Sequence, residues 1–283
     1  MLIEPRSKRV YANHINIHYW DWGGDGQPMV MLHPSRGFGR IWDFIARRLH
    51  PRYRVLCLDQ RGHGDTDKPD HGYTGEAYAA DLDAFTRELS LETIIVVGHS
   101  LGSRAGMIFA AQHPDNISHL IMVAGPHYVS VVPSDVREKK FRESRIREQE
   151  SVQIRFDSAQ QALESLRAPT SSYRSFDEEM LRHLVTYNMN QNRDGSLEWK
   201  WDTDAVAQTL SHIPDDLTPY IKRITCPILI PWGKRDQDLT PERVPIVKPL
   251  FPTARWELLD DVQYYIYLET PESLAKVIGE FLG

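Results

Sequence analysis

Short apolar runs alternate with segments of helical periodicity along most of this chain. The run at residues 93–97 is β-branched throughout and too short for a helix, so it predicts a strand buried on both faces. Residues 10–22 predict two short antiparallel strands around a turn at Asn13 and His14. Further strands are predicted at 28–32, 53–58, 117–124, 227–232 and 255–259, and helices at 40–49, 75–89, 101–113, 241–250 and 271–282. The alternation predicts an α/β fold, with a mostly parallel sheet of about eight strands and helices on both faces.

One long segment interrupts this alternation. From about residue 129 to 212 the sequence is charged and of helical period, as in DVREKKFRESRIREQE, with no run typical of a buried strand. We therefore expect a helical lid at residues 129–211, inserted after the sixth strand. The core would consist of residues 1–128 and 212–283.

Charge and composition narrow the classes of partner. The net charge of −6 over 283 residues, with scattered basic residues, argues against a nucleic-acid partner. The first residues lack the apolar core and cleavage site of a secretory signal, and no apolar run is long enough to span a bilayer. These features predict a soluble, cytoplasmic protein without a membrane partner. Cys57 and Cys226 lack metal-ligand spacing, so we expect buried free thiols and neither a metal nor another cofactor.

The candidate chemistry begins at Ser100, in the sequence GHSLG. Gly98, Ser100 and Gly102 form a G-x-S-x-G motif between a predicted buried strand and a predicted helix. A serine on such a sharp turn adopts strained backbone angles with its hydroxyl exposed, and the flanking glycines avoid clashes. The alternative interpretation is that the two glycines only allow a helix to pack closely on a strand.

These features resemble the α/β-hydrolase fold superfamily, in its lidded branch of esterases, lactonases and carbon–carbon bond hydrolases. The resemblance covers nearly the whole chain. It rests on His33 at a strand end, the turn at 59–64, the GHSLG motif at 98–102, GKRD at 233–236 and YLETPESL at 267–274. It implies acyl transfer on a small-molecule substrate.

The resemblance also implies roles for individual residues. Ser100 would be the nucleophile, and the backbone N–H groups of Leu101 and Ser35 would form the oxyanion hole. Asp236 would be the catalytic acid, with Asp238 as the alternative. A carboxylate at this strand end can also simply cap the following turn.

The family's catalytic histidine is replaced in this chain. Counting back from the LETPE sequence at 268–272 places Tyr264 at its position, preceded by Gln263 where glycine is common, and no histidine follows His212. A phenol, with an ordinary pKa of about 10, cannot accept the proton of Ser100 near neutral pH as imidazole does. Hydrolysis of ordinary esters is therefore expected to be weak, since loss of one triad member leaves only about 10³ to 10⁴-fold acceleration.

Three other histidines are candidates to replace it. His33 and His99 resemble residues that form hydrogen bonds within the scaffold, whereas His127 ends the sixth strand at the same edge of the sheet as Ser100. His127 is therefore the preferred alternative base, although it could merely begin the lid. We expect His33, Arg36 and His127 among the residues that contact the substrate. Pro34 stands where the family usually carries glycine.

The predicted lid supplies aromatic side chains that could roof a pocket over Ser100. Trp199 and Trp201 alternate across Lys200, so in an extended segment they share a face, and Tyr187 and Met189 lie nearby in sequence. The two tryptophans are therefore expected to bind a small, largely apolar substrate. The equal alternative is that they pack the lid onto the core.

Three functions remain open at this point. The first is a serine hydrolase of small esters, lactones or β-diketones. The second is a lyase, isomerase or cyclase that uses the oxyanion hole and Tyr264. The third is an inactive or engineered variant that only binds its ligand. The sequence leaves the substrate and the oligomeric state undetermined.

Overall fold

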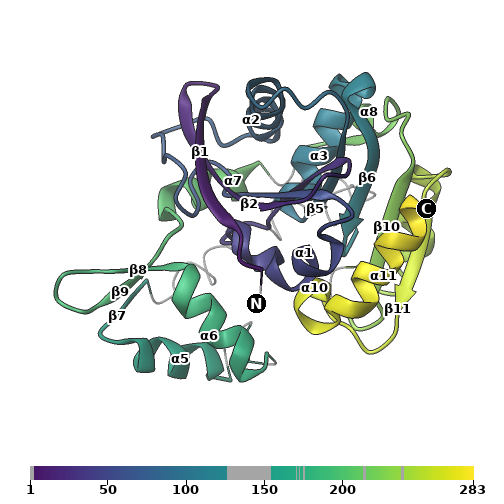
Figure 1. The fold of residues 1–283 in the computed structure, drawn as a ribbon. Coiled ribbons are helices and arrows are strands. Elements are labelled where there is room, and N and C mark those ends of the chain that lie inside the picture. Colours follow the sequence, from purple (N-terminus) through teal and green to yellow (C-terminus); the bar gives the residue numbers. More distant parts are fainter. Residues whose placement is uncertain are drawn as a thin grey trace.

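The computed structural model describes residues 3–125 and 154–283, with the exception of residues 170, 172, 175, 213, 214, 237 and 238. His127, Asp238 and the helical segment predicted at 135–150 therefore lie outside the described residues. Figure 1 shows the arrangement of the elements.

The main sheet has eight strands in the order β1-β2-β4-β3-β5-β6-β10-β11. β1 and β2 form an antiparallel hairpin, β2 pairs antiparallel with β4, and all other pairs are parallel. The predicted mostly parallel eight-stranded sheet is confirmed. The strands are β1 (Arg6–Ala12), β2 (Ile15–Gly23), β3 (Pro28–Leu32), β4 (Arg54–Leu58), β5 (Ile94–His99), β6 (Ile117–Val123), β10 (Ile228–Gly233) and β11 (Arg255–Leu259).

Helices cover both faces of the sheet because the central strands are apolar on both sides. In β5, Ile95 and Val97 belong to one apolar cluster, and Ile94 and Val96 belong to the other. α1 (Asp43–Leu49), α10 (Ile266–Glu269) and α11 (Pro271–Leu282) close the first cluster. α2 (Gly75–Glu88), α3 (Leu101–Gln112) and α8 (Thr218–Ile221) close the second. This division follows from the period of two along a strand.

Between β6 and β10 the described chain forms a separate small unit beside the main sheet (Figure 1). Its helices are α5 (Ala159–Arg167) and α6 (Glu178–Tyr187), and α7 (Thr203–Ser211) follows against the core (Figure 1), where the hydroxyls of Tyr78 and Thr209 lie 2.7 Å apart. Each of these three helices has a side-chain cap at its N-terminus. No strand of the main sheet lies in the described part of this segment, but it does contain short strands that the sequence did not predict. β7 (Arg155–Phe156), β8 (Met189–Gln191) and β9 (Leu197–Trp199) form a three-stranded sheet of their own, too short to show a periodic pattern.

The helix predicted at 241–250 is the other clear error. The structure has only one turn, α9 (Val244–Val247), followed by a 3₁₀ turn at Lys248–Leu250. Pro245 and Pro249 each lack a backbone N–H, so a continuous helix cannot form. The start of the helix predicted at 40–49 is also a 3₁₀ turn, at Gly39–Trp42, and a third 3₁₀ turn spans Pro114–Asn116.

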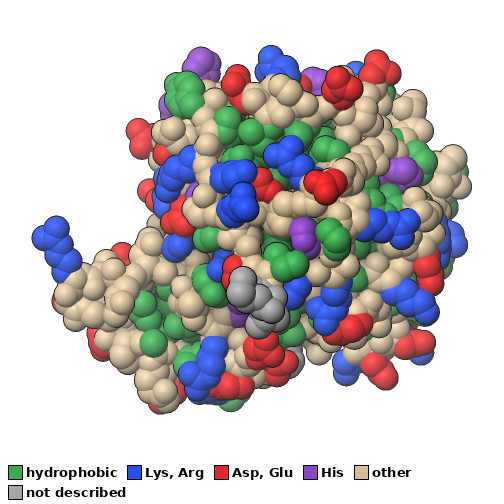
Figure 2. Space-filling view, viewed as in Figure 1, with side chains coloured by type: hydrophobic (Ala, Val, Ile, Leu, Met, Phe, Trp, Pro, Cys, Tyr) green, Lys and Arg blue, Asp and Glu red, His purple; other side chains and the backbone are tan. Residues whose placement is uncertain are grey.

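Three further features of the described residues are the distribution of surface charge, the length of the helices and the state of the cysteines. On the face shown in Figure 2, basic and acidic side chains are interspersed over the surface. Across the described ranges, the helices are all too short or too polar to cross a bilayer. Cys57 and Cys226 are free thiols, as predicted, with Cys57 fully buried and Cys226 half-buried.

Candidate active site

Ser100 lies on a strained turn between β5 and α3. Its backbone angles are φ 53° and ψ −110°, outside the regions that ordinary residues favour, and the residue is 5% exposed. A Cβ atom on Gly98 would lie 2.4 Å from the carbonyl carbon of Gly102, and one on Gly102 would lie 2.1 Å from the carbonyl oxygen of Leu32. Both glycines are therefore required by the close approach of strand and helix, and the outlying conformation predicted at Ser100 is observed.

Leu101 is the first residue of α3, directly after this turn. Ser100 accepts the first backbone bond of the helix, from the N–H of Arg104 at 3.0 Å. The N–H groups of the first turn of a helix have no acceptor within the helix and carry the positive end of its dipole. The end of α3 at Ser100 is therefore suited to stabilise negative charge.

His33 supports the loop that follows β3. Its Nδ1 donates to the carbonyl oxygen of Pro34 at 2.7 Å, and its Nε2 accepts the N–H of Gln60 at 2.9 Å. Burial lowers the pKa of His33 to about 4, so the ring is neutral. The structure therefore places His33 below the loop with both ring nitrogens used in the scaffold.

Ser35 and Arg36 form the tip of this loop. Ser35 Oγ is buried without a hydrogen-bond partner among the described residues. Arg36 has a positive φ of 64°, which an ordinary side chain adopts only when the surroundings enforce it. Its carbonyl oxygen accepts the side-chain amide of Asn188 at 3.1 Å, which ties the loop to the end of α6.

The two predicted roof tryptophans lie together above this loop. The rings of Trp199 and Trp201 stack with 5.9 Å between centroids and 22° between planes, so they share a face as expected. The guanidinium carbon of Arg36 lies 5.7 Å from the ring centroid of Trp201, within cation–π range. The structure thus brings Arg36, Trp199 and Trp201 together.

Asp236 lies in a loop that is bonded to the loop carrying Tyr264. The N–H of Arg235 donates to the carbonyl oxygen of Val262 at 3.0 Å. Asp236 is 3% exposed, and its Oδ1 accepts the N–H of Leu239 at 3.0 Å, so this carboxylate does cap the following turn. The structure therefore brings Asp236 and the Tyr264 loop together at the carboxyl ends of β10 and β11.

Tyr264 contacts the strained turn at residues 98–102, hereafter the elbow, through His99, the residue before Ser100. The ring centroids of Tyr264 and His99 are 4.3 Å apart. His99 is fully buried, and its Nδ1 lies 2.9 Å from the hydroxyl of Tyr267. Burial raises the pKa of Tyr267 well above its usual value, so this phenol stays neutral. Tyr265 completes an aromatic wall around His99, at 5.8 Å between centroids.

The sequence did not reveal several of these supporting residues. Asn188 and Gln60 hold the loop at residues 33–37 from other elements, and Tyr265 and Tyr267 surround His99. The only available signal was the concentration of tyrosines in YYIY at 264–267.

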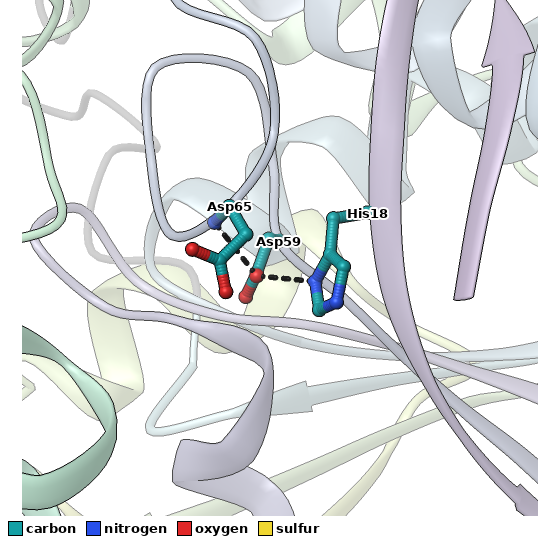
Figure 3. A group of neighbouring side chains, drawn as sticks. All are labelled: His18, Asp59 and Asp65. Atoms are coloured by element: carbon teal, nitrogen blue, oxygen red, sulfur yellow. Dashed lines mark hydrogen bonds and ion pairs between the residues drawn. The ribbon is translucent and has the colours of Figure 1, made fainter. Parts of the chain in front are cut away.

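A second group of polar side chains surrounds Asp59, at the end of β4. Its Oδ2 accepts a bond from His18 Nδ1 at 2.7 Å and from the N–H of Asp65 at 3.0 Å (Figure 3). Its Oδ1 accepts the N–H of Gly39 at 2.5 Å. His18, Asp59 and Asp65 lie close enough to suggest a metal site. However, His18 Nδ1 carries the proton that it donates to Asp59, and Lys200 pairs with Asp65 at 3.0 Å. The donor set fits a hydrogen-bond network better than a metal site.

Comparison with known proteins agrees with this fold. The sequence profile described as the alpha/beta hydrolase fold matches residues 27–271. The chain belongs to this family. Its relatives include a protein named as a hydrolase and one named as a deformylase.

Two relatives of this α/β hydrolase illustrate the range of sequence identity and coverage. 2-(Acetamidomethylene)succinate hydrolase of Mesorhizobium japonicum is 26% identical over 98% of this chain and 95% of that protein. N-formylmaleamate deformylase of Pseudomonas putida is 35% identical, but only over 41% of this chain and 44% of that protein. The crystal structure of E-2-(acetamidomethylene)succinate hydrolase has a TM-score of 0.86, with 26% identity, over 98% of this chain and 99% of that chain.

Proposed function

We propose that this protein is a serine hydrolase of a small acyl compound, with Ser100 as the nucleophile. The observation that carries the proposal is the strained backbone of Ser100 between β5 and α3, enforced by Gly98 and Gly102. Two relatives act on small acylated compounds according to their names. The substrate class proposed here is a small ester, lactone or related acyl compound.

The oxyanion of the tetrahedral intermediate would be held by two backbone donors. Leu101 offers the first N–H of α3, and Ser35 offers an N–H from the loop held by His33. Both donors belong to rigid backbone, so little reorganisation is needed when charge develops. One such donor is worth about 3 kcal/mol of transition-state stabilisation in comparable enzymes.

Asp236 and Tyr264 complete the proposed site, but they do not make an ordinary triad. A phenol donates a hydrogen bond readily and takes a proton poorly near neutral pH. Tyr264 would therefore orient or protonate the substrate, and turnover of ordinary esters would be slow. His127, outside the described residues, remains the alternative base.

The proposed lid, at residues 129–211, would cover this site. Three contacts of its described part support this role: Asn188 with Arg36, Trp201 with Arg36, and His183 Nε2 with the carbonyl oxygen of Arg40 at 2.8 Å. α7, at the end of the segment, is bonded to the core, since the N–H of Asp202 donates to Gly62 at 2.9 Å. The lid would therefore be anchored firmly on its C-terminal side.

The second candidate function is a non-hydrolytic reaction, such as that of a lyase or isomerase. The aromatic wall around His99 favours it, because a phenol hydroxyl such as that of Tyr264 is a suitable proton donor to an enolate or alkoxide. A protein that only binds its ligand is the third possibility.

A direct test compares steady-state hydrolysis of p-nitrophenyl acetate and of small lactones by the unaltered protein and by Ser100→Ala. We expect slow turnover that Ser100→Ala reduces to the background rate. Ser211→Ala, at an exposed serine far along the chain, is the matched control and should leave turnover unchanged. Unaltered turnover in Ser100→Ala would exclude Ser100 as the nucleophile.

A further inference from the structure

Ser7, which lies well away from the elbow, is linked by hydrogen bonds to a histidine and a buried carboxylate. Ser7 is an exposed residue of β1, and its Oγ lies 2.8 Å from Nε2 of His18. The other ring nitrogen of His18, Nδ1, lies 2.7 Å from Oδ2 of Asp59 (Figure 3). His18 and Asp59 are each only 1% exposed. A serine hydroxyl, an imidazole and a carboxylate thus form one continuous chain of hydrogen bonds.

The chemistry of Asp59 fixes which atoms carry protons. Burial alone would raise the pKa of Asp59, but the hydrogen bond and electrostatic attraction of His18, followed by the bonds from Asp65 and Gly39, outweigh it and hold the pKa below its usual value. The carboxylate is therefore ionised and can only accept, so Nδ1 of His18 carries a proton. In the tautomer that carries its proton on Nδ1 alone, Nε2 can accept a hydrogen bond from the Ser7 hydroxyl. This is the arrangement in which a histidine activates a serine.

Strand register explains why these groups meet. Ser7 is opposite Trp20 and Arg9 is opposite His18, so Ser7 and His18 are diagonal neighbours on one face of the hairpin. The Trp20 ring meets the His18 ring edge-on, with 4.9 Å between centroids, which restricts the imidazole. The side chain of Arg9, two residues after Ser7 in β1, lies on the same face of the strand as that of Ser7. Its positive charge favours an attacking group or substrate that develops negative charge.

We propose that Ser7 is a second acyl-accepting serine, activated by His18 and Asp59, that reacts with acyl donors bearing a good leaving group. A bond forms between Ser7 Oγ and the carbonyl carbon, while the serine proton passes to His18 Nε2. The bond to the leaving group, such as p-nitrophenolate, then breaks, and His18 gives its proton to that group or to water. The products are the Ser7 ester and the free alcohol or phenol.

This site is separate from the elbow. β1 is the end strand of the sheet, and β2, β4 and β3 lie between it and β5. At about 4.8 Å per strand, the two strands are roughly 19 Å apart. Acylation at Ser7 can therefore be measured without interference from Ser100.

The experiment uses the full-length Ser100→Ala protein, treated with p-nitrophenyl acetate and analysed by peptide mass spectrometry. Ser211, also exposed and without a histidine partner in the described structure, is the internal control. We expect Ser7 to be acetylated at least about ten times faster than Ser211, as general-base assistance typically gives about 10² to 10⁴-fold. Adding Ser7→Ala to this protein should remove the adduct, and Ser7→Ala in the protein that keeps Ser100 should leave the turnover at Ser100 unchanged.

Two further measurements test whether the hydrogen-bond chain causes the reactivity of Ser7. In urea-unfolded protein the difference between Ser7 and Ser211 should vanish, because the hydrogen-bond chain is lost. In the folded protein, His18→Gln should slow acetylation of Ser7 at least tenfold, with circular dichroism as the check on folding. If Ser7 reacts no faster than Ser211 in the folded protein, or equally fast after unfolding, the proposal is wrong. The unfolding comparison decides the question even if His18→Gln does not fold.

Discussion

The ring of Tyr264 packs against the ring of His99, with 4.3 Å between centroids, and so contacts the residue immediately before Ser100. This contact links the loop after β11 to the turn after β5. The position that the sequence assigned to a missing imidazole is therefore filled by an aromatic ring next to the elbow, and its chemistry is open to direct tests.

Restoring a histidine should create an efficient esterase. We expect Tyr264→His, combined with Gln263→Gly to give the ring room, to raise kcat/KM for p-nitrophenyl esters by about 10² to 10⁴-fold, because imidazole can accept the Ser100 proton. Stopped-flow or steady-state absorbance measures the change. Tyr265→His is the matched control, since Tyr265 also faces His99 but occupies the neighbouring position. Equal gains in both variants would contradict a specific role for position 264.

Gly102 should tolerate no side chain. Its Cβ would lie 2.1 Å from the carbonyl oxygen of Leu32, so we expect Gly102→Ala to lower the free energy of unfolding by about 2 to 3 kcal/mol. Gly279→Ala is the control, because its added Cβ would meet no described atom within 4 Å apart from the adjoining backbone of its own helix. That variant should gain about 0.5 to 1 kcal/mol from helix propensity. Urea unfolding measures both, and a neutral Gly102→Ala would contradict the packing described for the elbow.

His63 should make the protein sensitive to acid. Burial, followed by the nearby His33, lowers the pKa of His63 to about 3. The unfolded chain binds a proton near its ordinary pKa of 6.5, so the contribution of His63 is present above pH 6.5 and is lost as pH falls towards 3. The expected loss is about 1.4 kcal/mol per pH unit.

His63→Asn tests this sign. The Asn side-chain amide can retain the bond that His63 Nδ1 makes to the carbonyl oxygen of Arg61 at 2.9 Å, while the titration is removed. Urea unfolding of both proteins between pH 7.5 and 4.5 should show the unaltered protein losing stability faster than the variant. Parallel curves would show that His63 is not the buried neutral group described here.

Trp201 should contribute to substrate binding if the lid forms a roof. In the Tyr264→His background, we expect Trp201→Leu to raise KM for aryl esters about tenfold with a smaller change in kcat, because the ring lies over Arg36 beside the proposed oxyanion loop. Trp199→Leu is the matched control, since its ring stacks on Trp201 and meets Phe156 edge-on. Loss of stability in both variants with unchanged KM would favour the packing role.

The core of the fold was predictable because its signals are local. β3 and β11 have the predicted bounds, and α11 begins at Pro271 as expected. Proline at the first position of a helix and β-branched runs between turns need no tertiary information. The same local rule was misapplied at 241–250, where Pro245 and Pro249 should have counted against a helix.

The site was predictable only in part. Ser100 was found because its strained turn requires glycines at fixed spacing. The contacts of Tyr264 with His99, and of Asn188 with the Arg36 loop, join residues more than 150 positions apart, and no pattern along the chain encodes them. The chain of Ser7, His18 and Asp59 escaped notice for the same reason, because it depends on the register of the first hairpin.

Gly233 packs directly against the backbone of the loop that carries Tyr264, so this backbone contact does not depend on the side chain at position 264. A Cβ there would lie 2.3 Å from the carbonyl oxygen of Val262 and 2.5 Å from that of Gln263, so main chain packs directly on main chain. The N–H of Gln263 also donates to Glu269 at 3.0 Å. The path of this loop is thus held by main-chain packing on Gly233 and by the Glu269 carboxylate, and neither contact involves the side chain at position 264. We therefore expect that Tyr264→His changes the chemistry available beside Ser100 while the backbone of the loop keeps its path.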